Sequence, residues 1–142
     1  MGFDLKPRNR KAGGFHMGAF SWSWMLQDGC VGWVLGIGKG FKPAQFVYRN
    51  RPDGLCVAHN DGARVTATEA KEMARMATLL CDWQDTLHEQ WMMQPEEKRR
   101  EMEEYNSKNM HGLYSPPVRR DFIELVREFA VWAVKSGGFT IH

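Results

Sequence analysis

Residues 60–80, NDGARVTATEAKEMARMATLL, decide the fold of this chain. Thr66 stands three residues before Glu69, which is the spacing of a capping box, and this pair predicts that a helix starts there. Apolar residues then recur every three or four positions, as they do on the buried face of a helix. This face consists of Met73, Met76, Ala77, Leu80, Trp83, Leu87 and Trp91. We expect the helix to end near Met93, because Pro95 opens the next segment.

Two more helices are expected after the long one. Residues 95–112 predict a charged helix, because Pro95 suits the first turn and acidic residues come directly after it. Its apolar content is thin, so it either projects from the body or is partly mobile. The last helix is expected over residues 118–135, and a Ser-Gly-Gly stop signal follows it at residues 136–138. Its apolar stripe consists of Phe122, Leu125, Val126, Phe129, Trp132 and Ala133.

Short apolar segments outside these helices predict strands. Residues 44–58 predict a hairpin whose turn is the RPDG sequence of residues 51–54, and residues 60–62 predict a second tight turn. The final residues 139–142, FTIH, are expected to form a strand beside that hairpin. We therefore expect an α+β fold, with a small, mainly antiparallel sheet packed against two or three helices in one domain of residues 1–142.

Two segments predict irregular structure. Residues 1–14 predict an extended arm whose basic side chains are either solvated or in contact with an anionic ligand. Residues 31–42 are rich in glycine and predict a flexible loop. The GIGKG sequence within them does not match a Walker phosphate loop, because Trp33 occupies the first glycine position and Gly40 the serine or threonine position. The basic side chains of the arm are Lys6, Arg8, Arg10 and Lys11.

The aromatic-rich stretch GGFHMGAFSWSWML, residues 13–26, is either part of the core or a recognition surface. Residues 19–30 predict a short helix with Ser21 as its N-cap. We expect Phe20 and Trp24 to pack inward, since the long helix offers an apolar face to them. The side chains of this stretch that remain as ligand contacts are His16, Ser21 and Trp22.

Composition and charge exclude several classes of protein. The formal net charge is +2, which gives no support for a strongly basic nucleic-acid-binding protein. We expect no signal peptide, because residues 1–14 contain no apolar stretch, and no apolar run approaches the roughly 18 residues that a membrane span needs. The three cysteines are widely spaced and form no CxxC pair, so we expect reduced thiols in a cytoplasmic protein.

No catalytic or metal-binding signature is visible. The five histidines form no HExxH or HxH pair, and no GxSxG nucleophile elbow occurs. Cys56 and His59 lie three residues apart in a predicted strand, where they would point to opposite faces. We therefore predict no catalytic residue, no metal and no cofactor, and an enzyme is the less favoured interpretation.

The turn before the long helix is the more informative candidate site. Asn60 and Asp61 either form the turn and nothing more, or they join Arg64 beside a helix N-terminus that attracts anions. Aromatic side chains from the 15–24 stretch could then stack on a flat ring. The candidate ligand-binding residues are therefore His16, Ser21, Trp22, Trp24, Asn60, Asp61 and Arg64.

The chain resembles a diffuse, largely uncharacterised group of small phage and bacterial proteins. The matching pieces are MGFDLKP at the start, FHMGAFSWSW, NDGARVTATEAKEMARMA in the middle and FAVWAVKSGGFTIH at the end. Together they span most of the chain. The resemblance implies no established activity, but it implies a phage-like context, in which proteins of this size often counter host defence.

Two hypotheses follow. In the first, the chain is a phage-type anti-defence protein that sequesters a nucleotide-derived immune signal without turnover, so its partner is a small phosphorylated or nucleotide-type ligand. In the second, it is a protein–protein inhibitor that blocks a host defence complex through its Trp- and Met-rich surface or the charged helix 95–112. Both place the protein in the host cytoplasm and away from membranes, and both leave open a homo-oligomer.

Overall fold

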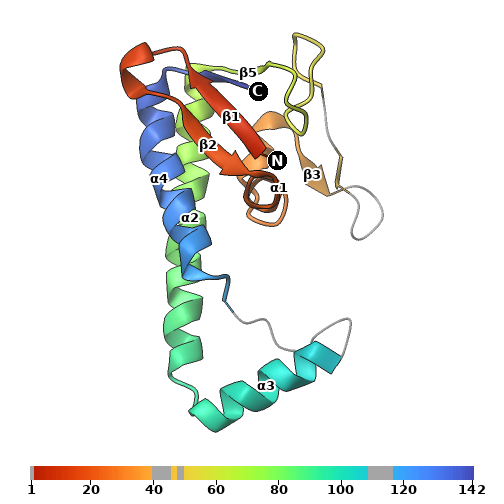
Figure 1. Cartoon of the computed structure of the whole chain (residues 1–142), viewed down its shortest axis with the longest axis vertical. Coiled ribbons are helices and arrows are strands. Elements are labelled where there is room, and N and C mark those ends of the chain that lie inside the picture. Colours follow the sequence, from red (N-terminus) through yellow and green to blue (C-terminus); the bar gives the residue numbers. More distant parts are fainter. Residues whose placement is uncertain (1, 40–45, 48–49, 109–116) are drawn as a thin grey trace.

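The computed structural model describes residues 2–39, 46–47, 50–108 and 117–142. A four-stranded antiparallel sheet lies against two long, neighbouring helices, and a further helix leads away from their lower end (Figure 1). The expected α+β class is confirmed. The sheet has the order β2-β1-β6-β5, and its strands are β1 (Gly2–Pro7), β2 (Phe15–Gly18), β5 (Ala63–Val65) and β6 (Phe139–Ile141).

The helices follow the predicted order. They are α1 (Ala19–Leu26), α2 (Ala67–Met92), α3 (Glu96–Lys108) and α4 (Arg120–Ser136). Two short 3-10 helices, η1 (Arg10–Ala12) and η2 (Val31–Leu35), and a second sheet of β3 (Gly38–Lys39) and β4 (Phe46–Val47) complete the described elements.

The first strand corrects the prediction of an irregular N-terminal arm. Residues 2–7 form β1, an inner strand that pairs with β2 on one side and β6 on the other. Polar and apolar residues alternate along it, so Leu5 enters the core while Asp4 and Lys6 face the other side. This period of two is the strand signal that the basic composition of the segment obscured.

The last strand is confirmed, but its neighbours differ from the expected ones. β6 lies between β1 and β5 rather than beside a hairpin of residues 44–58. Within the described residues, β4 pairs with β3, and residues 55–59 form no strand. The predicted turn at residues 51–54 is present, because the Gly54 N–H donates to the Arg51 carbonyl at 2.8 Å and Gly54 has a φ of +81°.

The start of α2 confirms the capping box. The Thr66 hydroxyl accepts from the Glu69 N–H at 3.2 Å, and the Glu69 carboxylate accepts from the Thr66 N–H at 3.0 Å. The buried face is shifted from the predicted one, since Trp83 is 60% exposed. Helix α4 and η2 pack against sides of α2 that do not include Trp83. The buried residues of α2 are therefore Ala70, Met73, Ala74, Ala77, Cys81 and Gln84.

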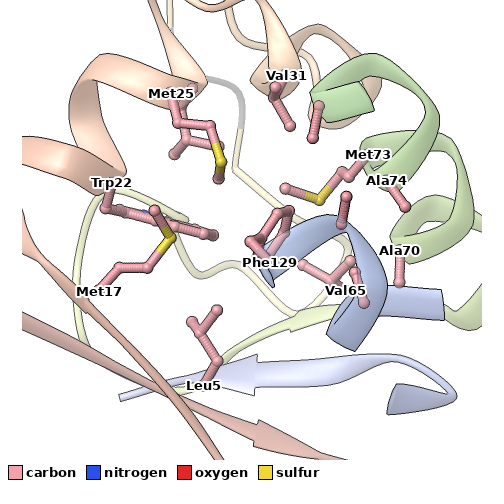
Figure 2. Close-up of a cluster of buried hydrophobic side chains, with 14 of the residues drawn as sticks. Leu5, Met17, Trp22, Met25, Val31, Val65, Ala70, Met73, Ala74 and Phe129 are labelled. Carbon is pink, nitrogen blue, oxygen red and sulfur yellow. The ribbon is translucent and has the colours of Figure 1, made fainter. Parts of the chain in front are cut away.

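Helix α1 reverses the predicted orientation of two aromatic residues. Gly18, not Ser21, is its N-cap, so the helix starts earlier than the cap signal indicated. Trp22 is fully buried, and its indole N–H donates to the Val57 carbonyl at 3.0 Å. Figure 2 shows the Trp22 ring beside Met17 and Met25 and directed toward Phe129. Phe20, expected inside, is 69% exposed and lies against Phe122 at a ring distance of 5.5 Å.

Residues 31–37 are part of the core rather than a flexible loop. Val31, Leu35 and Ile37 are buried, and η2 packs against α2. Gly32 permits this packing, because a Cβ there would lie 2.8 Å from the Leu26 carbonyl oxygen. The rest of the predicted loop includes residues 40–42, which lie outside the described residues.

Helix α3 lies within residues 95–112, where a charged helix was expected. It has no buried residue, and salt bridges such as Arg100–Glu96 join side chains along its exposed surface. Figure 1 shows it leading away from the end of α2 that lies farthest from the sheet. Residues 109–112 lie outside the described part of the chain.

Candidate functional site: a basic cavity at the sheet

Three polar side chains form a row on the face of the sheet that points away from the core. The strand register places Lys6 of β1 opposite Thr140 of β6, and Thr140 opposite Arg64 of β5. Their neighbours along the strands, including Leu5, Ile141 and Val65, are buried on the other face. Since adjacent strands lie about 4.8 Å apart, Lys6 and Arg64 flank Thr140 at a separation of roughly 10 Å between backbones.

A cavity of about 480 Å³ opens at this row. Arg8, which follows β1, adds a third basic side chain to Lys6 and Arg64. No Asp or Glu of the described residues lines the cavity, and none of the three cations forms an ion pair within that part of the chain. The lining residues are Lys6, Pro7, Arg8, Arg64, Val65, Thr66, Ala67, Gly137, Gly138, Phe139 and Thr140.

The start of α2 and the end of α4 meet at the cavity. Gly137, with a φ of +68°, is the left-handed C-cap of α4, as the predicted stop signal required. Gly138 follows with a φ of +92°, and a Cβ there would lie 2.7 Å from the Val65 carbonyl oxygen and 2.9 Å from the Ala67 nitrogen. Only glycine allows this approach, which brings the chain end against the first turn of α2.

The turn of residues 51–54 holds the backbone of Arg64. Asp53 accepts from the Arg64 N–H at 3.1 Å and from the Leu55 N–H at 2.9 Å. The Arg51 side chain donates to the Arg64 carbonyl at 3.2 Å and pairs with Glu69 at the start of α2. Both backbone groups of Arg64 are therefore satisfied, and its side chain remains at the cavity.

The charges in this turn shift two carboxylates toward their ionised forms. Hydrogen bonds from the backbone N–H groups of Leu55 and Arg64 hold the pKa of Asp53 below its ordinary value. Partial burial raises the pKa of Glu69, but hydrogen bonds from Arg51 and Thr66 outweigh it and leave the pKa below the ordinary value. Both groups are thus ionised at neutral pH.

The structure separates the predicted site residues. Arg64 lines the cavity. His16 lies on the same sheet face but on the far edge strand β2, where its Nδ1 is 2.7 Å from the Asp4 carboxylate. Asn60 and Asp61 are exposed in the preceding turn and do not line the cavity, and Asp61 lies 3.9 Å from His59.

The three α1 candidates lie on the core side of the sheet. Trp22 has no exposed surface, Ser21 is buried, and Trp24 is half-buried against the core. None of them lines the basic cavity. The α1 rings are therefore not available to stack on a ligand at this cavity, because the fold uses them for packing.

Sequence reasoning missed Lys6, Arg8 and Thr140 as parts of one site. Lys6 and Arg8 were recognised as basic but were placed in an irregular arm. The alternation in GFDLKP and in FTIH was the available signal, since it puts Lys6 and Thr140 on outward faces of strands. The pairing of those strands is a contact between segments far apart in the sequence, which a local sequence pattern does not predict.

Other kinds of site find little support in the described chain. Within residues 2–39, 46–47, 50–108 and 117–142, no group of three His, Cys, Asp or Glu side chains is placed to hold a metal ion. All three cysteines are free, and burial raises the pKa of the Cys81 thiol. No helix in the same ranges is long and apolar enough to cross a membrane.

Comparison with protein-family models, curated proteins and solved structures gives no match to this chain. The chemistry of the cavity therefore carries the functional argument.

Proposed function

We propose that this chain binds a small phosphorylated or nucleotide-type ligand, without turnover, in the basic cavity. The observation that carries the proposal is the convergence of Lys6, Arg8 and Arg64 on a cavity that no described carboxylate lines. Phosphate oxygens are strong acceptors, and arginine can bind them through two parallel hydrogen bonds.

Two neighbouring groups extend the same chemistry. The Thr140 hydroxyl lies between Lys6 and Arg64 in the strand register, and its Oγ1 is 2.9 Å from His142 Nε2. When that ring nitrogen is the donor of the bond, the hydroxyl proton remains for a phosphate oxygen. The first turn of α2 also borders the cavity, and the N–H groups there that the capping box does not use favour an anion. The supporting donors thus come from four separate elements of the fold.

In the phage-like setting that the resemblance implies, such a cavity would sequester a nucleotide-derived immune signal. To sequester the signal without turnover, the protein must bind and bury it in stoichiometric amounts and release it chemically unchanged. This anti-defence role rests on the resemblance, while the ligand chemistry rests on the cavity.

Calorimetric titration with cyclic nucleotides, ADP-ribose derivatives and inorganic phosphate tests the binding. We expect Arg64→Ala to weaken binding of the phosphorylated probe by at least about tenfold, since hydrogen bonds to a charged group are worth about 1.5–3 kcal/mol. Arg10→Ala is the matched control, because Arg10 belongs to the same basic segment but does not line the cavity. Heat release followed by chromatography should return the probe unchanged.

Two outcomes would overturn the proposal. The first is that no phosphorylated probe binds, or that Arg64→Ala and Arg10→Ala bind equally well. The second is that the released probe is chemically altered, which would make the chain an enzyme.

A groove between α2 and α4 favours the alternative, an inhibitor that binds a host defence protein. It has a volume of about 610 Å³, and its exposed apolar residues are Val131 and Val134. Lys71 and Arg75 line its α2 side. A pull-down from host lysate that yields a stoichiometric protein, lost in Val134→Asp and kept in Arg64→Ala, would favour this function over the first.

A further inference from the structure

The strand β2 lies at one edge of the four-stranded sheet. We infer that two copies of this chain associate by antiparallel pairing of their β2 strands, which joins two four-stranded sheets into one of eight strands. The inference is independent of the ligand proposed above, since it uses the opposite edge of the sheet.

The register shows which backbone groups β2 presents outward. Asp4 exchanges two backbone hydrogen bonds with His142, which directly follows β6, at 2.7 and 2.9 Å, so its N–H and C=O point away from β2. His16 is opposite Asp4 in the β1–β2 pair, which makes this a non-hydrogen-bonded pair. The N–H and C=O of His16 therefore point away from the sheet, toward the position of a further strand.

Nothing in the described chain occupies those two groups. No backbone or side-chain hydrogen bond to the His16 N–H or C=O is found within residues 2–39, 46–47, 50–108 and 117–142. The strand also lacks the lysine, proline or bulge that commonly protects an edge. Gly14 and Gly18, two residues before and after His16, have no side chain that could cover the edge beside it.

The surface beside β2 is complementary to itself in charge. Helix α4 lies under this side of the sheet, since Phe15 of β2 contacts Phe129 and Trp132 of α4 at ring distances of 6.0 and 5.4 Å. The exposed flank of α4 carries Glu124 and Glu128 before Lys135. None of these three side chains forms an ion pair in the described part of the chain.

A twofold axis beside β2 would run the two α4 helices in opposite directions. Glu124 and Glu128 of one copy would then face Lys135 of the other. A hollow of about 400 Å³ on the same flank, lined by Ala12, Val131 and Trp132 among others, would be covered by the second copy. Val131 is 60% exposed in the single chain. The open backbone groups of β2, the charges on α4 and the apolar hollow beside Val131 thus all favour a second copy of this chain as the partner at this edge.

The pairing would leave the basic cavities open. The cavity lies over β1, β6 and β5, while the proposed contact lies at β2, at the other edge of the sheet. Each dimer would therefore carry two cavities on one continuous sheet face.

Charge reversal on α4 tests the inference. Sedimentation of the full chain should show a shift from 16.4 kDa toward twice that mass as concentration rises. We expect Glu128→Lys and Lys135→Glu each to weaken dimerisation by about tenfold, because each places like charges opposite one another. The double variant should recover most of the loss. Glu97→Lys on α3 is the control with the same charge change, and it should leave the dimer unchanged.

Amide hydrogen exchange locates the contact. Protection of the His16 amide should rise with protein concentration, while that of Arg64 on the opposite edge should not change. A chain that stays at 16.4 kDa up to about 1 mM would overturn the inference. So would a dimer without added protection at His16, or a double variant that dimerises no better than the single ones.

Discussion

At each edge of the sheet, one residue directs its backbone N–H and C=O outward, but the two edges differ in whether these groups are hydrogen-bonded. At the β5 edge, Arg51 and Asp53 bind both outward backbone groups of Arg64. At the β2 edge, the corresponding groups of His16 have no such partner within the described residues. One turn therefore closes an edge and also fixes a cationic side chain at the cavity. The comparison shows that, among the described residues, only the β2 edge keeps outward backbone groups for pairing, so the proposed contact lies away from the cavity over β1, β6 and β5.

The largest effect is expected from a substitution at Gly138, where the chain after α4 approaches the backbone at the end of β5. Gly138→Ala would push a Cβ into the backbone of Val65 and Ala67 and would strain a left-handed residue. We expect a loss of about 3 kcal/mol in the free energy of unfolding, measured in urea, and it should exceed the loss in the control. Gly13→Ala is that control, since Gly13 has a φ of +70° but no atom within 4 Å of the added Cβ. Equal losses would show that the close approach at Gly138 is unimportant.

Removal of the turn side chain that closes the β5 edge should have an intermediate effect. Arg51→Ala would leave the Arg64 carbonyl and the Glu69 carboxylate without their donor. We expect a loss of about 1–3 kcal/mol in the free energy of unfolding, together with faster amide exchange across β5. Arg10→Ala, on an exposed side chain of η1, should cost less than about 0.5 kcal/mol. Unchanged exchange at β5 would contradict the role given to Arg51.

Acid should loosen the closed edge before the open one. The folded-state pKa values of Asp53 and Glu69 lie below their ordinary values, so these carboxylates stabilise the fold above about pH 4. That contribution is lost as the pH falls through the folded-state values. Amide protection at Arg64, corrected for intrinsic exchange, should therefore decrease below about pH 4 while His16 changes little. In Asp53→Asn, which keeps an acceptor oxygen but cannot titrate, the decrease should be smaller.

The smallest effect on folding, and the sharpest on assembly, is expected from a charge on the open edge. His16→Lys places a lysine on an exposed position of β2, as edge-protected strands do. We expect the free energy of unfolding of the monomer to change by less than about 0.5 kcal/mol, while dimerisation weakens by about tenfold in sedimentation. Lys6→Arg, on the inner strand β1, is the comparison variant. A dimer that tolerates His16→Lys would show that β2 is not its contact.

Local signals in the sequence predicted the helices well. The capping box at Thr66 and Glu69 acts within one turn, and the glycine stop after α4 acts within two residues, so neither needs the rest of the fold. The burial of aromatic residues was predicted wrongly for Phe20. A helix face is buried or exposed according to what packs on it, and α1 directs Trp22 rather than Phe20 into the core.

The candidate site was predicted only at Arg64. Lys6, Arg64 and Thr140 are separated by 58 and 76 residues, and only strand pairing places them in one row. The sequence by itself determined where α2 begins, where α4 ends and which strand residues alternate, because these depend on neighbours along the chain. The tertiary structure alone decided the strand order, the cavity and the open edge at β2. Those features arise from contacts between distant segments, whose free energy no single segment contains.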